Sequence, residues 1–322
     1  MDLTQFIKQS DIRQNLLELV KKPEIAKPEL LFYENNYNAT LLGYAIDFYI
    51  KFKYDFLYQN KTSKYFANEL SRKFYADIEI HTRHEKNLKK VWVTSGGDEL
   101  SKGCFASKEQ IKWLNEDINE NDSLKPVCTL YELHERVDES IHECNKIHKS
   151  KSTSENFYKH LILLAKVIPG IKWRKIGNNP LNAEKENIKA LESLIKLIPD
   201  SVFKKRGVFL RDQHFSFGFI DGRPDYILDN EIFEIKTTKD FFTRSHFNQV
   251  LLYYFLYKCN EKKYKKKNIN INKISIYYPL YGKIIEIIPD DILTSTKSKQ
   301  FIKYLKLEID DLKKMMKRMR ER

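Results

Sequence analysis

The sequence predicts an α/β (α+β) protein with a mixed central sheet flanked by helices and a large, mainly helical insertion. Two short apolar runs, 226–228 and 232–235, are separated by Asp229 and Asn230, a pair typical of a hairpin turn. A second strand pair follows at 274–278 and 283–288, and helical patterns lie before and between these pairs. With 322 residues the chain can form one large core that carries an insertion.

The first hairpin carries charged side chains that converge. Because side chains alternate along a strand, Glu234 and Lys236 share one face, opposite Phe233 and Ile235. Asp225, at the start of the partner strand, can face the same side. Two converging carboxylates are costly unless a positive charge lies between them, and Mg²⁺ prefers carboxylate and carbonyl oxygens. A cation with an ammonium group beside it suits attack on a phosphodiester, whereas a solvated Glu–Lys strand pair is the alternative.

A helix is predicted after the hairpin, capped by Thr243 or Ser245 and continuing through Tyr257. Gln249 and Tyr253 are spaced i, i+4, so they lie on one face of this helix. An isolated Glu-x-Lys pair is common on exposed strands. The ordered series of carboxylate, hairpin, Glu-x-Lys and Gln-x-x-x-Tyr is much rarer.

This series resembles the RecB-like branch of the PD-(D/E)XK nuclease superfamily, which has Gly-x-x-Asp, (Asp/Glu)-x-Lys and Gln-x-x-x-Tyr in this order. The corresponding residues here begin at Gly222, Glu234 and Gln249. The pattern is also similar to a group of bacterial proteins that have Ile-Lys-Thr-Thr-Lys at the active strand, which is 235–239 in this chain. The resemblance implies a restriction-endonuclease-like core and a Mg²⁺- or Mn²⁺-dependent nuclease acting on DNA.

The resemblance also implies a set of metal ligands. Asp225, Glu234 and the backbone carbonyl of Ile235 would hold the cation. Upstream, the branch has a helix with a small residue and, four positions later, a His or acidic ligand; Gly43 and Asp47 match that element on a helix expected over 38–58. The commoner residue there is His. Asp47 is therefore either a further ligand, direct or through water, or a polar position on a half-buried helix capped by Asn38 or Thr40.

The remaining motif residues have implied roles in catalysis. The metal would polarise the scissile phosphate and lower the pKa of a bound water. Lys236 would orient that water and offset charge on the phosphoryl oxygens. Gln249 and Tyr253 would position the substrate strand or the metal-binding residues. His214 and His246 could touch a phosphate outside the first ligand shell.

The chain is expected to divide into four parts. Residues 1–58 are N-terminal helices with breaks at Pro23 and Pro28 and include the first motif helix, and 59–205 are the insertion. Residues 206–290 are the catalytic core and 291–322 a basic amphipathic helix. Within the insertion, a short strand is predicted at 91–94, and the predicted helices cover 107–118, 129–148, 155–168 and 183–198, with polar loops at 119–125, 149–154 and 174–182.

Two basic segments have open interpretations. The segment 258–267 holds six lysines and one Glu, and is either a phosphate-contacting loop or an ordinary exposed loop. The C-terminal helix has an apolar stripe that either docks on its own domain or forms a homodimer seam. The stripe consists of Ile302, Leu305, Ile309, Leu312, Met316 and Met319.

Composition favours a nucleic-acid partner, because the formal net charge is +13, although a lysine-rich proteome would give the same bias. No membrane span or signal peptide is apparent, so we expect a cytoplasmic protein with reduced thiols. Cys104, Cys128, Cys144 and Cys259 form no Cys-x-x-Cys pair. Only Cys259 follows the active strand, so the iron–sulfur cluster of some RecB-like relatives is not expected. No phosphate-loop motif is present, so unwinding would require a partner ATPase or helicase.

The function expected is hydrolysis of nucleic-acid phosphodiesters, in a repair, recombination or phage-defence context. One alternative is a catalytically inactive nuclease fold that binds DNA or a partner protein. A second is an enzyme that acts on another phosphate ester, such as a nucleotide.

Overall fold

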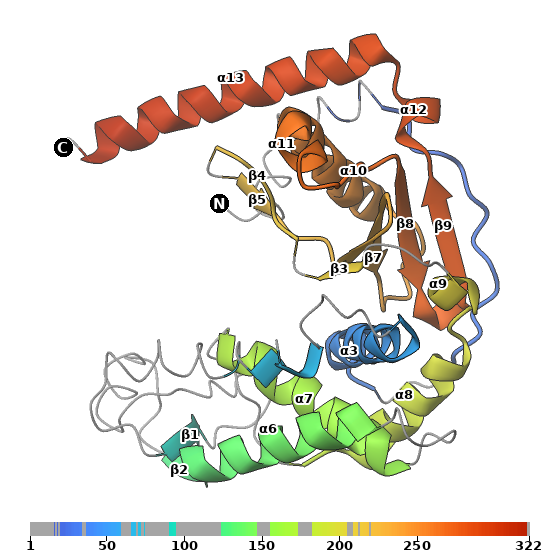
Figure 1. Ribbon diagram of the computed structural model, residues 1–322, viewed down its shortest axis with the longest axis vertical. Helices are drawn as coiled ribbons and strands as arrows, with labels where there is room; N and C mark the ends of the chain where they lie inside the picture. The colour runs from blue at the N-terminus through green and yellow to red at the C-terminus, as the bar shows by residue number, and fades with distance from the viewer. Residues whose placement is uncertain are drawn as a thin grey trace. The chain divides into compact units, whose positions relative to one another are not determined.

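The computed structural model describes residues 16, 18, 20–33, 37–58, 66–68, 70–71, 74, 90–94, 124–146, 155–172, 182–204, 209–211, 213–218 and 220–320 (Figure 1). The chain forms two compact units. The first, here called the sheet unit, consists of Met1–Phe32 and Leu197–Arg322. The second, the helical unit, is Tyr33–Lys196. Each contains its own buried apolar side chains.

A five-stranded mixed sheet is the centre of the sheet unit, with the order β3-β6-β7-β8-β9. The strands are β3 (Phe209–Arg211), β6 (Tyr226–Leu228), β7 (Glu231–Ile235), β8 (Lys273–Tyr278) and β9 (Lys283–Ile287). Among these five strands, β7 and β8 pair in parallel, and the other neighbours are antiparallel. A parallel pair needs a crossover connection, which here contains helix α10 (Arg244–Cys259). The mixed helix-and-sheet class is therefore confirmed.

Both predicted hairpins are present. Strands β6 and β7 pair with Tyr226 opposite Phe233, and their rings stack with centroids 4.9 Å apart. Asp229 in the turn has a φ of 54°, a left-handed conformation that Asp and Asn tolerate better than most residues. The second hairpin joins β8 to β9 through the short helix η2 (Pro279–Tyr281). Turn chemistry and apolar runs were thus sufficient to predict both strand pairs.

A second, two-stranded sheet precedes the first motif strand. It is made of β4 (Phe215–Phe217) and β5 (Ile220–Gly222), which pair antiparallel around Gly218, whose φ is 62°. This hairpin packs against α10. Its last residue, Gly222, leads through two residues to Asp225.

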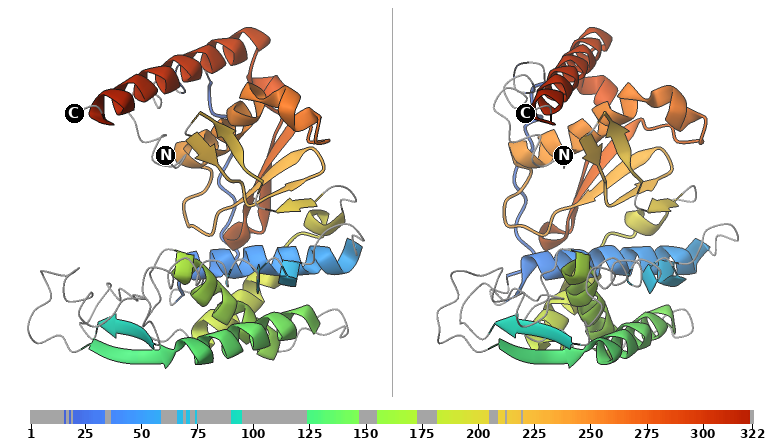
Figure 2. Two further views of the ribbon diagram at one scale, coloured as in Figure 1. Left: turned by 60° about the vertical axis from the view of Figure 1, so that its left-hand side comes forward. Right: turned by 90° about the vertical axis from the view of Figure 1, so that its left-hand side faces the viewer.

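Helix α10 packs against β7 and β8, and the C-terminal helix α13 (Ser295–Arg320) packs against α10 (Figures 1 and 2). Phe301, Leu305 and Ile309 of α13 are buried, and the Phe301 ring lies 4.3 Å from that of Phe255. Docking of the stripe on its own unit is therefore confirmed for this half of α13. The side chains of Leu312, Met316 and Met319 are outside the part of the chain that the structure describes.

The lysine-rich segment 258–267 is largely exposed, as predicted, but most of it is helical instead of a loop. It contains the end of α10 and a short helix, α11 (Glu261–Lys265), whose Tyr264 is buried. The sheet unit also contains the short helices α9 (Ser201–Lys204) and α12 (Pro289–Ile292). Residues 20–33, predicted within a helical N-terminal region, contain no helix.

The helical unit contains α3 (Ala39–Tyr58), α6 (Leu130–Asn145), α7 (Glu155–Lys172) and α8 (Lys185–Lys196). All four were predicted to within a few residues, and Asn38 caps α3 by accepting a hydrogen bond from Leu41 N at 3.0 Å. Strand β1 (Lys90–Thr94) was also predicted, but its partner β2 (Leu124–Thr129) was not. The predicted helix at 107–118 lies outside the described residues. No helix in the described ranges is long and apolar enough to cross a membrane.

Thr243→Ala is expected to lower the free energy of unfolding of the sheet unit by about 1 kcal/mol. Thr243, not Ser245, is the cap of α10, and its Oγ1 accepts a hydrogen bond from His246 N at 3.3 Å. Ser245→Ala is the matched control because Ser245 is exposed within the helix, and its effect should stay within about 0.5 kcal/mol. Urea denaturation measures both variants, and equal losses would contradict the assignment of the cap.

Candidate active site

Strand β7 and helix α10 bring four of the predicted site residues into one hydrogen-bonded cluster. Lys236 Nζ donates to Glu234 Oε1 at 2.7 Å and to Gln249 Oε1 at 2.8 Å. Gln249 Nε2 donates to Glu234 Oε1 at 2.9 Å and to the Tyr253 hydroxyl at 2.8 Å. The i, i+4 spacing on α10 therefore places Gln249 between Tyr253 and the charged pair.

Asp225 joins this cluster through the backbone of β7. Its Oδ2 accepts a hydrogen bond from Ile235 N at 2.7 Å, which fixes the carboxylate beside the strand that carries Glu234. Lys236 N donates to Tyr277 O at 2.9 Å, so β8 holds the other side of the same backbone segment. The hairpin and the parallel neighbour together determine where both carboxylates lie.

Burial excludes the solvated strand pair as an interpretation of Glu234 and Lys236. Glu234 is 5% exposed. The side chain of Lys236 is 18% exposed, and α10 lies over both residues. Charged side chains that serve only solubility are normally exposed, because their burial costs free energy.

The cluster shifts the protonation of its members. Burial and then the charge of Asp225 raise the pKa of Glu234 to about 7, against the opposing effect of Lys236. Burial lowers the pKa of Lys236, but the charge and hydrogen bond of Glu234 and the charge of Asp225 outweigh it, so this pKa is raised. Lys236 is therefore a cation at neutral pH, while Glu234 titrates close to neutrality.

One carboxylate oxygen of the cluster has the surroundings of a cation ligand. Glu234 Oε2 is buried and accepts no hydrogen bond from the described part of the chain. Two carboxylates share one ammonium group here, so a divalent cation would balance the remaining charge. No group of three or more His, Cys, Asp or Glu gathers among the described residues. Mg²⁺ commonly binds one or two carboxylates and keeps several waters, so the donors present fit a cation of that type.

Asp47 belongs to the helical unit, on α3. It forms an ion pair with Lys51 one helical turn later at 2.6 Å, and both side chains are buried. The i, i+4 spacing of Asp47 and Lys51 accounts for this ion pair. The sequence motif that suggested Asp47 as a metal ligand did not take Lys51 into account. The role of Asp47 as a metal ligand, and that of the Ile235 carbonyl, stay predictions.

His246 lies close to the cluster through a contact that the sequence did not indicate. Its Nδ1 is 3.0 Å from the hydroxyl of Tyr278, at the end of β8. Burial first, and then the charge of Lys236, lower the pKa of His246 to about 4, against the effect of Asp240. The imidazole is thus neutral at pH 7, so it adds no positive charge beside Lys236.

Gly222 lies where the β4–β5 hairpin comes very close to α10. A Cβ atom on Gly222 would lie 2.8 Å from Tyr253 Cδ1 and 3.0 Å from Leu256 Cδ1. The β4–β5 hairpin can approach α10 closely only without that atom. This contact connects two motifs that are 31 positions apart in the sequence.

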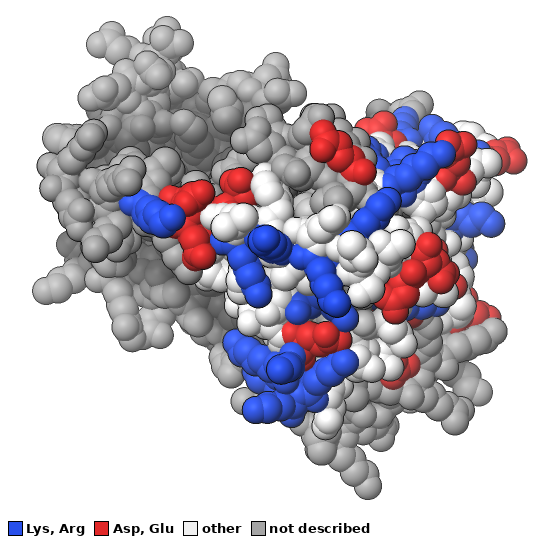
Figure 3. Space-filling model, turned by 90° about the horizontal axis from the view of Figure 1, so that it is seen from above, with Lys and Arg blue, Asp and Glu red and all other residues white. Residues whose placement is uncertain are grey.

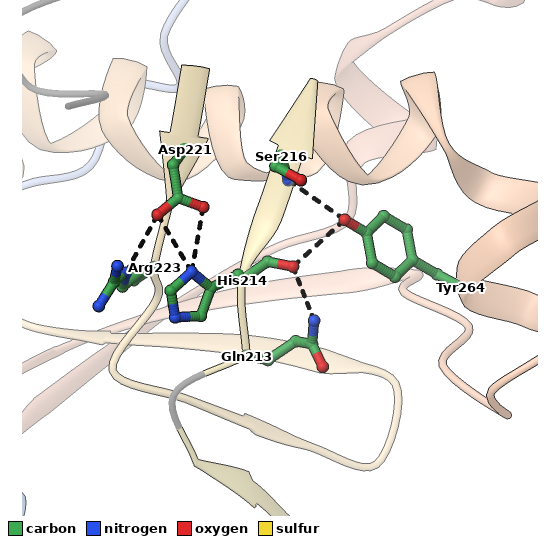
Figure 4. Close-up of polar contacts among 6 residues, drawn as sticks. All are labelled: Gln213, His214, Ser216, Asp221, Arg223 and Tyr264. Atoms are coloured by element: carbon green, nitrogen blue, oxygen red, sulfur yellow. Dashed lines mark hydrogen bonds and ion pairs between the residues drawn. The ribbon is translucent and has the colours of Figure 1, made fainter. Parts of the chain in front are cut away.

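The β4–β5 hairpin carries a polar network of its own (Figure 4). Asp221 lies between His214 Nδ1 at 3.1 Å and Arg223 Nε at 3.1 Å. On the other side, the Tyr264 hydroxyl accepts from Ser216 N at 3.2 Å and donates to His214 O at 3.2 Å. The hairpin that leads into Asp225 is therefore joined to α11.

No family model, curated protein or solved structure matches the chain. The geometry defines a mixed helix-and-sheet unit whose central hairpin carries two carboxylates and a lysine. Helix α10 covers this hairpin and contributes a glutamine and a tyrosine to the cluster.

Proposed function

We propose that the sheet unit is a metal-dependent nuclease of the PD-(D/E)XK type, with a restriction-endonuclease-like core of the RecB-like branch. One observation carries this proposal. Glu234 Oε2 is buried without a hydrogen bond from the described residues, beside a second carboxylate and a lysine. A protein that keeps a costly acidic oxygen in this state gains from a cation that binds there.

Asp225 and Glu234 would hold the cation, Mg²⁺ or Mn²⁺. When bound, it would supply Lewis acidity to a phosphate oxygen and make a water more acidic. Lys236 has a raised pKa and stays protonated, so its ammonium group can offset the negative charge that develops on the phosphoryl oxygens. Glu234 titrates near neutrality, so a cation held there would favour its ionised form.

Gln249 would act as a positioning residue. It bonds to Lys236, Glu234 and Tyr253 at once, so it fixes the direction of the ammonium group relative to the carboxylate. Residues that orient metal ligands and charged groups commonly contribute roughly 10–100-fold to activity or affinity. Tyr253 in turn packs against Gly222 and holds the hairpin in place.

The proposed substrate is nucleic acid, with DNA implied by the motif resemblance. The formal net charge of +13 favours a polyanion. The chain shows no phosphate-loop motif, so a separate ATPase or helicase would supply any unwinding that cleavage requires.

A second candidate is a nuclease fold that binds nucleic acid without cutting it. The observation in its favour is the direct 2.7 Å contact between Lys236 and Glu234, which neutralises one carboxylate without a metal. This module would keep nucleic-acid binding but would show no dependence on a divalent cation.

One assay separates the two candidates. Purified protein is incubated with linear, circular and single-stranded DNA and with RNA, in Mn²⁺ or Mg²⁺ and then in EDTA. The proposed nuclease cleaves at least one substrate only with metal, and Asp225→Asn abolishes cleavage. Asp229→Asn is the control, because Asp229 lies in the turn of the same hairpin and Asn tolerates its φ of 54°. Binding without cleavage of any substrate would favour the second candidate.

A further inference from the structure

Helix α11 and the turn that follows it present a concentrated set of exposed lysines. Four of them, here called the lysine face, are Lys262, Lys263, Lys266 and Lys267, and all are exposed. Figure 3 looks down from the top of Figure 1, where α11 and α13 lie, and Lys and Arg side chains form a dense group on this side.

Acidic neighbours do not neutralise the lysine face. Glu261, the acidic residue of α11, already pairs with Lys258 at 3.0 Å and with Lys265 at 2.9 Å. Within the described ranges, no ion pair involves the four lysines of the face. Lys262 and Lys266, like Lys263 and Lys267, are one helical turn apart, and like charges at this spacing destabilise a helix. The arrangement therefore brings no gain in stability.

The face is held on an ordered support. Ile269 N donates to Tyr264 O at 3.0 Å and Asn268 N donates to Lys265 O at 3.0 Å, so the chain closes tightly after α11. Tyr264 is 2% exposed and its hydroxyl bonds to β4, as Figure 4 shows. Asn260 Nδ2 donates to Ser216 O at 2.7 Å, which adds a second link to the same strand. The charges are thus fixed relative to the β4–β5 hairpin.

That hairpin continues directly into the candidate active site. Arg223, with a side chain 51% exposed, follows β5 and precedes Asp225 by two positions. Along this hydrogen-bonded path the order is lysine face, Tyr264, β4–β5, Arg223 and Asp225. A polymer that contacts the lysine face therefore binds the same unit as the candidate catalytic cluster.

The chemistry of the face favours a phosphate backbone over a lipid surface. Binding to a membrane interface uses exposed apolar side chains beside the basic ones. The exposed large apolar side chains of the described residues are Ile25, Leu31, Tyr33, Leu57, Ile288 and Leu307. None lies in 258–271, where Tyr264, Ile269 and Ile271 are buried. The lysine face can therefore recognise a ligand only through its positive charge. Lysines one turn apart are separated by roughly 6 Å along a helix. This distance is comparable with the length of duplex strand that carries about two phosphates.

We propose that the lysine face binds the sugar–phosphate backbone of nucleic acid and holds the polymer on the sheet unit outside the catalytic cluster. This inference rests on the proposed function, because the bound polymer is taken to be the substrate. It assigns the affinity for long substrates to α11 and the turn after it, and leaves the bond-breaking step to the β6–β7 hairpin and α10.

The test measures binding of a labelled DNA of about 30 nucleotides, long enough to span several phosphate contacts, single-stranded and duplex, in EDTA over a range of salt concentrations. Lys262, Lys263, Lys266 and Lys267 are all replaced by Gln in one variant. The control variant replaces four exposed lysines elsewhere, Lys27, Lys185, Lys189 and Lys283, and so changes the net charge equally. Circular dichroism confirms that both variants fold, as expected for exposed positions.

The lysine-face variant is expected to bind at least about ten-fold more weakly, with a salt slope that falls by about one for each phosphate that the protein no longer neutralises. The DNA affinity of the control variant should stay within about two-fold of that of the unchanged protein. Dispersed surface charges act only weakly at physiological salt, where they are screened. Equal losses in the two variants, no loss in the lysine-face variant, or no binding by the unchanged protein would each overturn the inference.

Cleavage of the same DNA in Mn²⁺ distinguishes this inference from the proposed function. A raised KM with unchanged kcat in the lysine-face variant supports both. DNA binding that depends on the lysines, without any cleavage, would support binding by the lysine face and contradict the nuclease assignment. If the lysine-face variant cleaved DNA with unaltered KM and unaltered binding, the nuclease assignment would stand and the proposed role of the lysine face would be wrong.

Discussion

Glu234→Gln is expected to reduce metal-dependent cleavage by at least about a hundred-fold, since removal of residues that merely support metal ligands already costs roughly 10–100-fold. The amide keeps an oxygen that can accept the hydrogen bonds of Lys236 and Gln249, so the cluster stays assembled. What disappears is the negative charge beside Asp225 that a divalent cation needs. The loss should appear in metal affinity, measured by titration calorimetry, as well as in turnover.

The same variant is expected to be more stable than the unchanged protein above pH 7. The pKa of Glu234 is raised from 4.5 to about 7 in the folded state, so the folded protein holds a proton that the unfolded chain releases. The stability of the unchanged protein relative to the variant is greatest below pH 4.5 and falls as the pH rises to 7. The full change is about 3 kcal/mol.

Chemical denaturation at pH 5 and pH 8, with and without Mg²⁺, measures this difference. Mg²⁺ should stabilise the unchanged protein at pH 8 and leave the variant unaffected, because a ligand stabilises only a state that binds it. Glu286→Gln is the control, since Glu286 lies on β9 of the same sheet with a side chain 56% exposed. If the Glu234→Gln variant cleaved DNA as well as this control, Glu234 would have no place in the proposed active site.

Lys236→Met is expected to slow turnover strongly and to destabilise the sheet unit by about 3–5 kcal/mol at pH 8. The side chain of Glu234 would then lie buried without its cationic partner. Because the charge of Lys236 lowers the pKa of Glu234, its removal raises that pKa further. The penalty should therefore shrink at pH 5, where Glu234 is protonated in the folded protein and partly protonated in the unfolded chain.

Turnover and DNA affinity are measured together for this variant. We expect a far larger loss in kcat than in binding, since one buried ammonium group adds little to the attraction of a long polyanion. Lys283→Met on β9 is the control, because Lys283 is an exposed lysine in the same sheet. Equal losses in binding and turnover would mean that Lys236 acts only through general electrostatics.

Several features of the sheet unit were predictable because they depend on local chemistry. The turn at Asp229 and Asn230 and the apolar runs on either side determine the β6–β7 hairpin. Thr243 caps α10, although Ser245 was an equal candidate in the sequence. Once this helix forms, its periodicity places Gln249 and Tyr253 on one face, and the structure joins them by a hydrogen bond.

Other expectations were wrong where tertiary contacts override local composition. Most lysines of 258–267 are exposed as expected, but the predicted loop was wrong, because buried Tyr264 anchors the short helix α11 within this segment. Strand β2 was missed because its partner, β1, lies far upstream, so that Thr94 pairs with Leu124 and Lys90 with Thr129. A solvated Glu234 was an open interpretation in the sequence, and α10 packs over β7 and excludes it.

The sequence by itself determined the order and identity of the residues in the candidate site: Asp225 before a hairpin, Glu234 and Lys236 on one face of a strand, and Gln249 with Tyr253 on a helix. Only the tertiary structure decided their chemical state. Burial of Glu234, the raised pKa that follows and the close approach of Gly222 to Tyr253 all depend on segments that pack from elsewhere in the chain. Periodicity fixes which side chains share a face, whereas desolvation depends on what covers that face.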